Sequence, residues 1–417
     1  MKAIDGGRLE RELARSAFSY PSYRRYWVAG VAMVFGLQFR FIGSGWLVHT
    51  LTESPFWLGV PGVVSAIVTI SLTIPAGALA DRVDCRRLVV IGRAGAGLLH
   101  GALGLAVWLD QATVSLVVAW AAGTGALAAL TNPAQAAMLP RLIERQAMQS
   151  AVAYTSAIWN SMRIIGPAAA GLMIAWIGIG QAFFVTMAGY ALSAGLVASL
   201  ELAPPDAAGL RRGDDRLLAG VRYIFRNRIF LATIGLSFFS SLFGRSYVVL
   251  LPVFADDILH IGVRGFGSME AAAGVGALAG TLAMARIRVT RHAGHAMVAA
   301  AIGFGLGIAL FAASRDTLSS LLLLAGGSLC ASIYLNLGMT TLQLLVPDAL
   351  RGRVMGVWGL TWFLSSAGGF VAATLAEWIG VELAVGLGAL AVSAFAAAIW
   401  LTSSEVRGLD RMPEGIR

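Results

Sequence analysis

Long apolar runs separated by short polar breaks fill almost the whole chain. A run of about 20 apolar residues is long enough for a helix to cross a hydrocarbon core of about 30 Å. Runs bounded by charged residues, proline or glycine fall at 26–50, 57–80, 88–109, 113–137, 150–175, 181–200, 229–254, 265–285, 293–313, 318–345, 353–376 and 381–402. This pattern predicts an all-α membrane protein with about twelve transmembrane helices.

One long polar interruption divides these runs into six and six. The predicted parts are a cytoplasmic N-terminal segment at 1–25, a first six-helix half at 26–200, a central cytoplasmic loop at 201–228, a second six-helix half at 229–402 and a cytoplasmic tail at 403–417. The two halves open on similar sequences, Tyr23–Trp27 and Phe225–Phe230, which favours an internal repeat and pseudo-symmetric halves. Within the central loop, Leu217–Phe225 has the apolar stripe of a helix lying on a membrane surface, and a plain linker explains it equally well.

Composition excludes several classes of protein. With 58% hydrophobic and 13% charged residues, a water-soluble globule of 417 residues would lack polar material for its surface. The net charge of +9 would suit a nucleic-acid partner only if basic residues gathered on one soluble face, whereas here they lie in short loops between apolar runs. We therefore expect the lipid bilayer as a partner and no nucleic acid.

The distribution of basic residues predicts the topology. Of the 31 Lys and Arg residues, 26 fall in the two tails and in alternate gaps between runs, with Arg93 counted among the gap residues. Cytoplasmic loops accumulate Lys and Arg. We therefore expect both termini in the cytoplasm. We further expect a monomeric, multi-pass protein of the bacterial cytoplasmic (inner) membrane.

No set of residues suggests an enzyme, a metal centre or a cofactor. The five histidines lie in different loops and runs without metal-ligand spacing, and neither Gly-x-Ser-x-Gly nor His-Glu-x-x-His occurs. Cys85 and Cys330 are placed where they cannot meet in a disulfide. The sequence predicts no catalytic residue, no metal and no cofactor.

The strongest local motif lies between the second and third runs. It reads Gly77-Ala78-Leu79-Ala80-Asp81-Arg82-Val83-Asp84-Cys85-Arg86-Arg87. This stretch resembles the signature loop of the major facilitator superfamily, in which a glycine, an aspartate and a basic cluster join two helices. Asp84 departs from that pattern by standing where the family usually has glycine, which leaves the turn geometry open.

The resemblance implies a cytoplasmic gating motif formed by Gly77, Asp81, Arg82, Arg86 and Arg87. In the family the corresponding contacts latch the two halves on the cytoplasmic side. The alternative is that these arginines only follow the positive-inside rule.

A second motif in the fifth run, Arg163-Ile164-Ile165-Gly166-Pro167-Ala168-Ala169-Ala170-Gly171, resembles the Gly-Pro signature of exporters and antiporters. Ala170 stands where that signature has another glycine. Pro167 lacks a backbone donor, and Gly166, Ala170 and nearby small residues permit close helix approach. Ordinary packing of small residues remains the alternative.

Across nearly the whole chain the pattern resembles the drug and siderophore exporter branch of this superfamily, which includes the enterobactin exporter and macrolide efflux proteins. The residues that carry this resemblance include Gly45-Trp46-Leu47-Val48, Leu250-Leu251-Pro252-Val253-Phe254-Ala255 and Arg351-Gly352-Arg353-Val354-Met355-Gly356. The resemblance implies a secondary active transporter that exports a small amphipathic or anionic molecule (a drug, siderophore or metabolite) by alternating access, with a proton as a possible coupling ion. A transport-inactive sensor or assembly partner with the same fold is the alternative.

Ionisable residues inside the runs are costly in a bilayer and mark candidate sites. Arg40, Arg163, Arg245 and Glu270 are of this kind, and we expect Arg40 and Arg245 to converge on the transport pathway. Glu270 could pair with Arg245, either for structure alone or as a protonatable switch. The candidate substrate or coupling residues are Gln38, Arg40, Asn160, Arg245, Glu270, Gln343, Trp358 and Trp362, and helix packing is the alternative role of each uncharged one.

Overall fold

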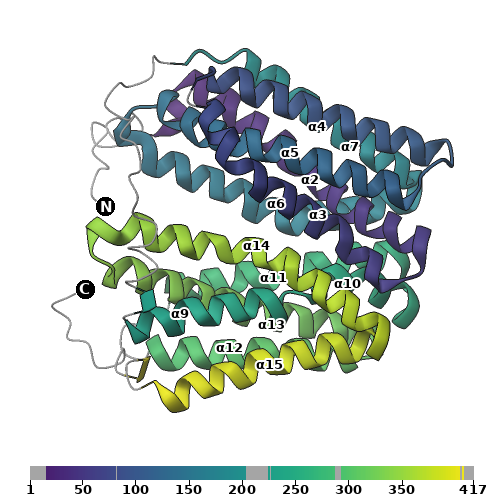
Figure 1. Cartoon of the computed structure of the whole chain (residues 1–417), viewed down its shortest axis with the longest axis vertical. Coiled ribbons are helices and arrows are strands. Elements are labelled where there is room, and N and C mark those ends of the chain that lie inside the picture. The colour runs from purple at the N-terminus through teal and green to yellow at the C-terminus, as the bar shows by residue number, and fades with distance from the viewer. Residues whose placement is uncertain are drawn as a thin grey trace, which may run out of the picture. The chain divides into compact units, whose positions relative to one another are not determined.

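The computed structural model describes residues 16–80, 82–202, 224–225, 227–286, 293–403 and 406–407. The helices of the first half are α2 (Pro21–Thr52), α3 (Pro55–Ala80), α4 (Cys85–Trp108), α5 (Val114–Met138), α6 (Met148–Ile177) and α7 (Ile179–Ala198). The short turn η1 (Ala17–Ser19) precedes α2, and η2 (Leu139–Arg141) and η3 (Arg145–Ala147) lie between α5 and α6. Figure 1 shows these helices in purple to teal.

The second half begins with a broken helix. Its segments are α9 (Arg228–Phe239), the π-helical η5 (Ser240–Gly244), α10 (Tyr247–Val253) and the π-helical η6 (Phe254–Ile258). There follow α11 (Gly262–Arg286), α12 (Ala293–Ala313), α13 (Thr317–Leu345), α14 (Asp348–Ile379) and α15 (Val381–Thr402). With α9 through η6 taken as one span, the described residues form twelve long helical spans, and the predicted all-α fold is confirmed.

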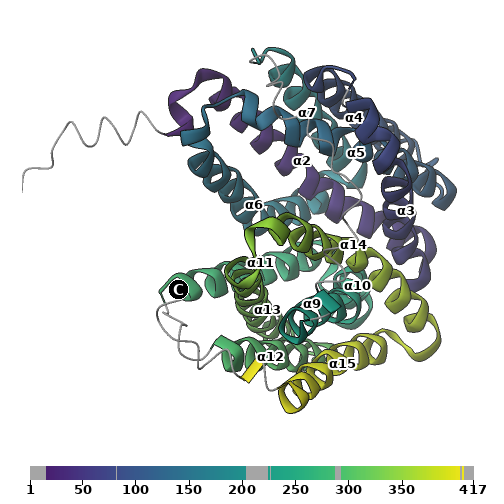
Figure 2. The same ribbon diagram turned by 60° about the vertical axis from the view of Figure 1, so that its left-hand side comes forward.

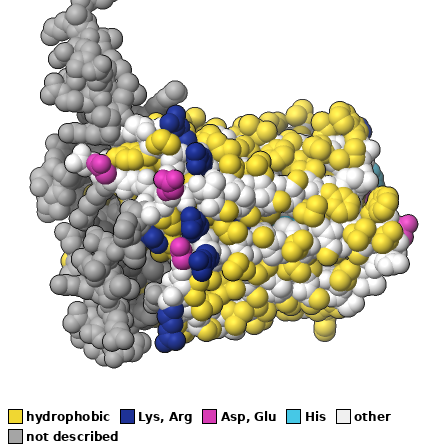
Figure 3. Space-filling model, turned by 90° about the horizontal axis from the view of Figure 1, so that it is seen from above, with side chains coloured by type: hydrophobic (Ala, Val, Ile, Leu, Met, Phe, Trp, Pro, Cys, Tyr) yellow, Lys and Arg dark blue, Asp and Glu magenta, His cyan; other side chains and the backbone are white. Residues whose placement is uncertain are grey.

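Ten of these spans are long and apolar enough to cross a membrane, counted over the described residues. The other two are α6 and α11, which carry Arg163 and Glu270, two of the ionisable residues that the sequence placed inside spans. Figure 3 shows one face of the molecule, with hydrophobic side chains over most of it and Lys and Arg side chains gathered toward one end. The protein is a multi-pass membrane protein.

Equivalent helices in the two halves end in the same way. Helix α6 is followed by the C-cap Gly178 (φ 92°) and helix α14 by the C-cap Gly380 (φ 87°), and each glycine leads directly into the next helix. A positive φ of this size is available to glycine without the steric cost of a Cβ. The repeat that the sequence suggested is therefore visible in the turns as well as in the helix order.

Polar caps fix the starts of several helices. Thr113 Oγ1 accepts a hydrogen bond from Leu116 N at the start of α5, and Asp316 Oδ2 accepts one from Ser319 N at the start of α13. The bond from the Ser319 backbone N–H lowers the pKa of the Asp316 carboxyl. These caps satisfy backbone donors where each helix begins.

The described helices form two compact units. The first takes the described residues within Met1–Leu47 and Val64–Arg211, and the second takes those within Val48–Val63 and Arg212–Arg417. In the first unit α4 lies along α7 and α5, and in the second α12 lies along α13 and α15 (Figures 1 and 2). The end of α2 and the start of α3 therefore pack with the later helices.

Candidate functional site

Helix α2 is bound to α7 by two polar rungs inside the first unit. Thr186 Oγ1 donates to Gly36 O (3.0 Å), and Ser193 Oγ donates to Ala29 O (2.6 Å). The rungs are seven residues apart on both helices, so they repeat after two turns on the same faces. Both hydroxyl-bearing residues are fully buried. This contact fixes the side of α2 that carries Arg40.

Arg40 lies in a polar cluster in the interior of the first unit. Its Cζ lies 5.9 Å from the centroid of the Trp120 ring on α5, and its charge acts on Tyr190 of α7. A guanidinium at this distance from an indole face gains cation–π attraction. The Nε atom of Arg40 is buried without a hydrogen-bond partner, and no carboxylate of the described residues forms an ion pair with it.

His100 completes this cluster. Trp120 Nε1 donates to His100 Nδ1 (3.0 Å), and the ring of His100 meets that of Tyr190 edge to face. Because Nδ1 accepts this bond, the neutral imidazole carries its proton on Nε2. His100 is 1% exposed, and its Nε2 has no hydrogen-bond partner among the described residues. His100 was not among the predicted site residues, since a lone histidine in an apolar run gives no pattern.

Arg93 is the largest fully buried side chain of the described chain and was misplaced by the sequence analysis. It lies within α4, not in a gap between spans, and it is 1% exposed. Its Nη atoms donate to Ser193 Oγ (2.6 Å) and Gln135 Oε1 (2.9 Å). Counting it as a cytoplasmic loop residue was wrong, because the helix begins at Cys85, two turns earlier.

Arg245 lies where the broken helix changes its hydrogen bonding. Its backbone N–H donates to Ser240 O (2.9 Å), five residues back, which closes the π turn of η5. Small residues make room for the widened turn, since Gly368 faces Leu242 O and Gly388 lies against Phe243 O. Tyr334 of α13, 3% exposed, lies within electrostatic range of the Arg245 side chain. Discontinuous membrane helices with polar groups at the break are typical of transporter binding sites.

The loop at 77–87 turns into α4 through an ordinary N-cap. Asp84 is the N-cap of α4, and its side chain accepts a hydrogen bond from Arg86 N (2.8 Å). The φ of Asp84 is −55°, so this position needs no glycine, and the departure from the family pattern is explained. Arg86 Nη1 donates to Leu200 O (2.8 Å) past the end of α7.

The remaining members of the gating motif make fewer contacts. Arg82 and Arg87 are exposed, and Gly77 lies in the last turn of α3. Asp81 lies outside the described residues, so the latch stays a prediction.

The span-five motif packs on α2. A Cβ at Gly166 would meet the side chain of Gln38, while Pro167 and Gly171 are buried and Arg163 is exposed. This close contact explains why glycine stands at 166.

The other predicted site residues lie in several environments. Asn160 and Gln343 are exposed, and Glu270 is half-buried. Trp358 is 7% exposed and packs in a core cluster with Phe230, Leu342 and Val354. The side chain of Trp362 lies outside the described residues. Arg40 and Arg245 belong to separate units, so their convergence stays a prediction. Arg245 and Glu270 lie in the same unit, and their pairing also stays a prediction.

The sequence as a whole defines the class. Residues 14–413 match the transmembrane secretion effector family, and the chain belongs to that family of membrane transporters of the major facilitator type. It is a family of transporters and not of enzymes, as expected from the sequence.

Individual relatives share less than a quarter of their aligned residues with this chain. The chain is 22% identical over 340 residues to the enterobactin exporter EntS of Shigella flexneri, covering 82% of this chain and 81% of that protein. It is 23% identical over 342 residues to the enterobactin exporter EntS of Escherichia coli O81 (strain ED1a), with the same coverage.

Solved structures agree on the fold. The nucleoside transporter NupG superposes with a TM-score of 0.72 at 13% identity, covering 91% of this chain and 98% of that one. A bacterial homologue of the human lysosomal transporter Spinster superposes with a TM-score of 0.69 at 14% identity, covering 94% and 99%. At these identities the likeness supports the predicted major facilitator fold and nothing about substrate.

Proposed function

We propose that this protein is a secondary active exporter that moves a small amphipathic or anionic molecule, of siderophore or drug type, by alternating access. The similarity to enterobactin exporters supports export of a siderophore-like compound. The protein would work in the bacterial inner membrane with both termini in the cytoplasm, which is consistent with basic side chains gathering at one end of the face in Figure 3.

The observation that carries this proposal is the environment of Arg40, a charged side chain inside a span. A guanidinium inside a membrane span is unfavourable unless a counter-charge or a polar cavity compensates it. Among the described residues Arg40 has an aromatic ring and no carboxylate, so its charge is available to an anion. The planar fork of guanidinium donors suits carboxylate, catecholate and phosphate oxygens.

The same proposal assigns roles to the other predicted residues. Arg245, at the π turn of the broken helix, would contribute a second positive charge to the pathway. Glu270 would carry a coupling proton, and Asp81 with the arginines after it would latch the cytoplasmic side. A latch role predicts that Asp81→Asn leaves the protein inserted while transport slows.

Transport by Arg40 variants tests the proposal. The purified protein, reconstituted in sealed vesicles, would be assayed for movement of enterobactin across the membrane. Arg40→Gln should weaken apparent substrate affinity by about 10- to 100-fold, since a hydrogen bond to a charged group contributes roughly 1.5–3 kcal/mol. Arg40→Lys keeps the charge but loses the fork, so an intermediate loss is expected.

The matched control is Arg315→Gln, which removes an exposed arginine paired with Glu382 and should leave transport unchanged. If Arg40→Gln transported with wild-type affinity, Arg40 would have no place in the pathway. If the wild-type protein moved neither enterobactin nor any of a panel of amphipathic anions, the exporter proposal would fail and a sensor or assembly role would replace it.

A further inference from the structure

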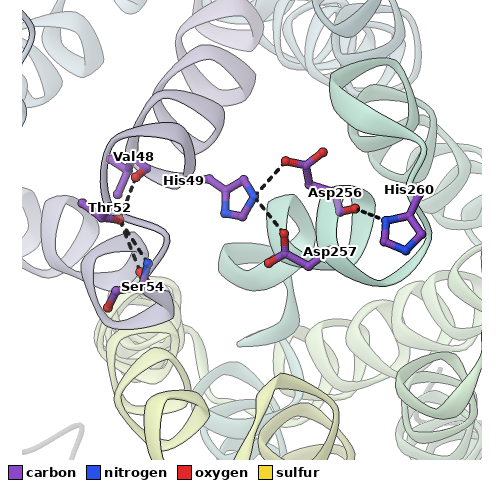
Figure 4. Close-up of polar contacts among 7 residues, drawn as sticks. All are labelled: Val48, His49, Thr52, Ser54, Asp256, Asp257 and His260. Carbon is purple, nitrogen blue, oxygen red and sulfur yellow. Dashed lines mark hydrogen bonds and ion pairs between the residues drawn. The ribbon is translucent and has the colours of Figure 1, made fainter.

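A histidine and two aspartates far apart in the sequence meet inside the second unit. His49 lies in the last turn of α2 and is 6% exposed. Asp256 and Asp257 lie side by side in η6. Figure 4 shows the imidazole of His49 directed at both carboxylates.

The three side chains present ligand atoms at metal-binding separations. His49 Nε2 lies 3.2 Å from Asp256 Oδ2 and 3.6 Å from Asp257 Oδ1, and the three ligand atoms all lie within 4.8 Å of one another. Zinc binds imidazole nitrogen and carboxylate oxygen at about 2.0–2.2 Å, which in a tetrahedron separates neighbouring ligands by about 3.4 Å. The two separations from His49 Nε2 lie on either side of this value, and the two carboxylate oxygens lie within 4.8 Å of each other, so one cation fits between the three groups once the carboxylates turn toward it.

The backbone around the two aspartates is held in place. Leu259 N donates to Phe254 O (2.9 Å) in the π turn, and Ile261 N donates to Ala255 O (2.8 Å). His260, at φ 52°, places its Nδ1 2.9 Å from Asp256 O (Figure 4). These contacts fix the backbone from which the two carboxylates project.

Charge and exposure are also suitable for a cation. One imidazole and two carboxylates carry a net negative charge in either protonation state of the histidine. The side chains of Asp256 and Asp257 are 44% and 58% exposed, so an ion can reach them from water, while His49 forms the buried wall. The nitrogen ligand selects against Mg²⁺ and Ca²⁺, which prefer sites made only of oxygen.

We propose that His49, Asp256 and Asp257 bind a divalent transition-metal cation of the zinc type, with water completing its coordination. The ion would join the end of α2 to η6. The neighbouring segment is already tied to α14, since Ser54 Oγ and Phe56 N both donate to Glu377 Oε2 at 2.8 and 3.3 Å. The metal would add a second, ion-dependent link to the same region.

Titration of the purified full-length protein with ZnCl₂, followed by isothermal calorimetry, tests the site. One Zn²⁺ per chain is expected, with no comparable binding of MgCl₂. His49→Gln, Asp256→Asn and Asp257→Asn should each weaken zinc binding by more than about 10-fold, because loss of outer contacts alone costs about 10- to 100-fold. The control is His295→Gln, which removes an exposed histidine of α12 whose ring lies tilted against that of Trp400, and which should leave the affinity unchanged.

Absence of stoichiometric zinc binding would overturn the site and leave an ion pair only. Zinc affinity equal to that of the wild-type protein in both His49→Gln and Asp257→Asn would also overturn the site. If His49→Gln did not fold, the exposed Asp257→Asn would decide the question, with the zinc-induced rise in melting temperature as a second measurement.

Discussion

Arg93 shows how a membrane helix accommodates a charge that no carboxylate of the described residues neutralises. Its two Nη atoms are satisfied by the neutral oxygens of Ser193 and Gln135, and Ser193 in turn donates to Ala29 O. One guanidinium thus connects α4 to α5 and α7, and through Ser193 to α2. Removing it would leave Ser193 Oγ, which is fully buried, and Gln135 Oε1, which is half-buried, without this donor.

Arg93→Leu should therefore lower the free energy of unfolding by about 1–3 kcal/mol, the cost of an unsatisfied buried polar group. Thermal melting in detergent measures the effect. The double variant Arg93→Leu with Gln135→Leu should recover part of the loss, because replacing both partners by apolar groups removes the unpaired acceptor. Arg24→Leu, at an exposed arginine of α2, is the control. Wild-type stability of Arg93→Leu would contradict the connecting role.

At the scale of elements, glycines set how closely the helices of the second unit approach. A Cβ at Gly276 on α11 would collide with Ala325 O of α13, and a Cβ at Gly280 would collide with Leu329 O. These are backbone contacts, which cannot move aside as a flexible side chain can. The glycine-rich stretch Gly274–Gly280 is thus a helix-packing surface, as small residues usually are in membrane helices.

Gly276→Ala should separate α11 from α13 and lower the melting temperature. Gly326→Ala on α13 is a matched control, because a Cβ there meets nothing within 4 Å. Losing a helix-interior glycine there should stabilise by about 0.5–1 kcal/mol. A Gly276→Ala variant as stable as Gly326→Ala would show that α11 and α13 pack less closely than described.

The seventh span, from α9 to η6, is broken by changes in backbone hydrogen bonding. Its apolar run predicted a continuous helix at 229–254, but two π segments interrupt it and extend it to Ile258. The first places Arg245 at a junction, and the second places Asp256 and Asp257 beside His49. Extra residues in a helical turn are invisible to a hydropathy pattern, because they change hydrogen bonding and not composition.

At the scale of the whole molecule, the proposed orientation can be tested across one helix. Arg87 lies in the first turn of α4 and Gln111 lies just beyond its other end, and both are exposed. In a cysteine-free background, an impermeant thiol reagent added to intact cells should label Gln111→Cys and leave Arg87→Cys unlabelled.

Native Cys85 is unsuitable for this purpose. It is 4% exposed and accepts a contact from Arg141 Nη1 at 3.1 Å, so its failure to react would say nothing about sidedness. If both variants were labelled only after the membrane is permeabilised, the reagent would not reach Gln111→Cys from outside the cell, against the proposed orientation. If Arg87→Cys alone were labelled in intact cells, the topology would be reversed.

The sequence by itself determined the membrane class, the twelve spans and the family. These follow from the lengths of apolar runs and from the local motif Gly77–Arg87, both of which are properties of neighbouring residues. The intramembrane position of Arg40 was predictable for the same reason, since a charge inside an apolar run is conspicuous.

Only the tertiary structure decided which polar residues meet. Arg93 looked like a loop residue because it follows Arg86 and Arg87 closely, and its burial depends on Ser193, which lies 100 residues away. Likewise, His100 joins Trp120 and Arg40 only when three helices pack. His49 and Asp256 are 207 residues apart, so no spacing rule for metal ligands could have connected them. Hydropathy places each helix in the bilayer, but packing sets its rotation, and rotation determines which side chains share a site.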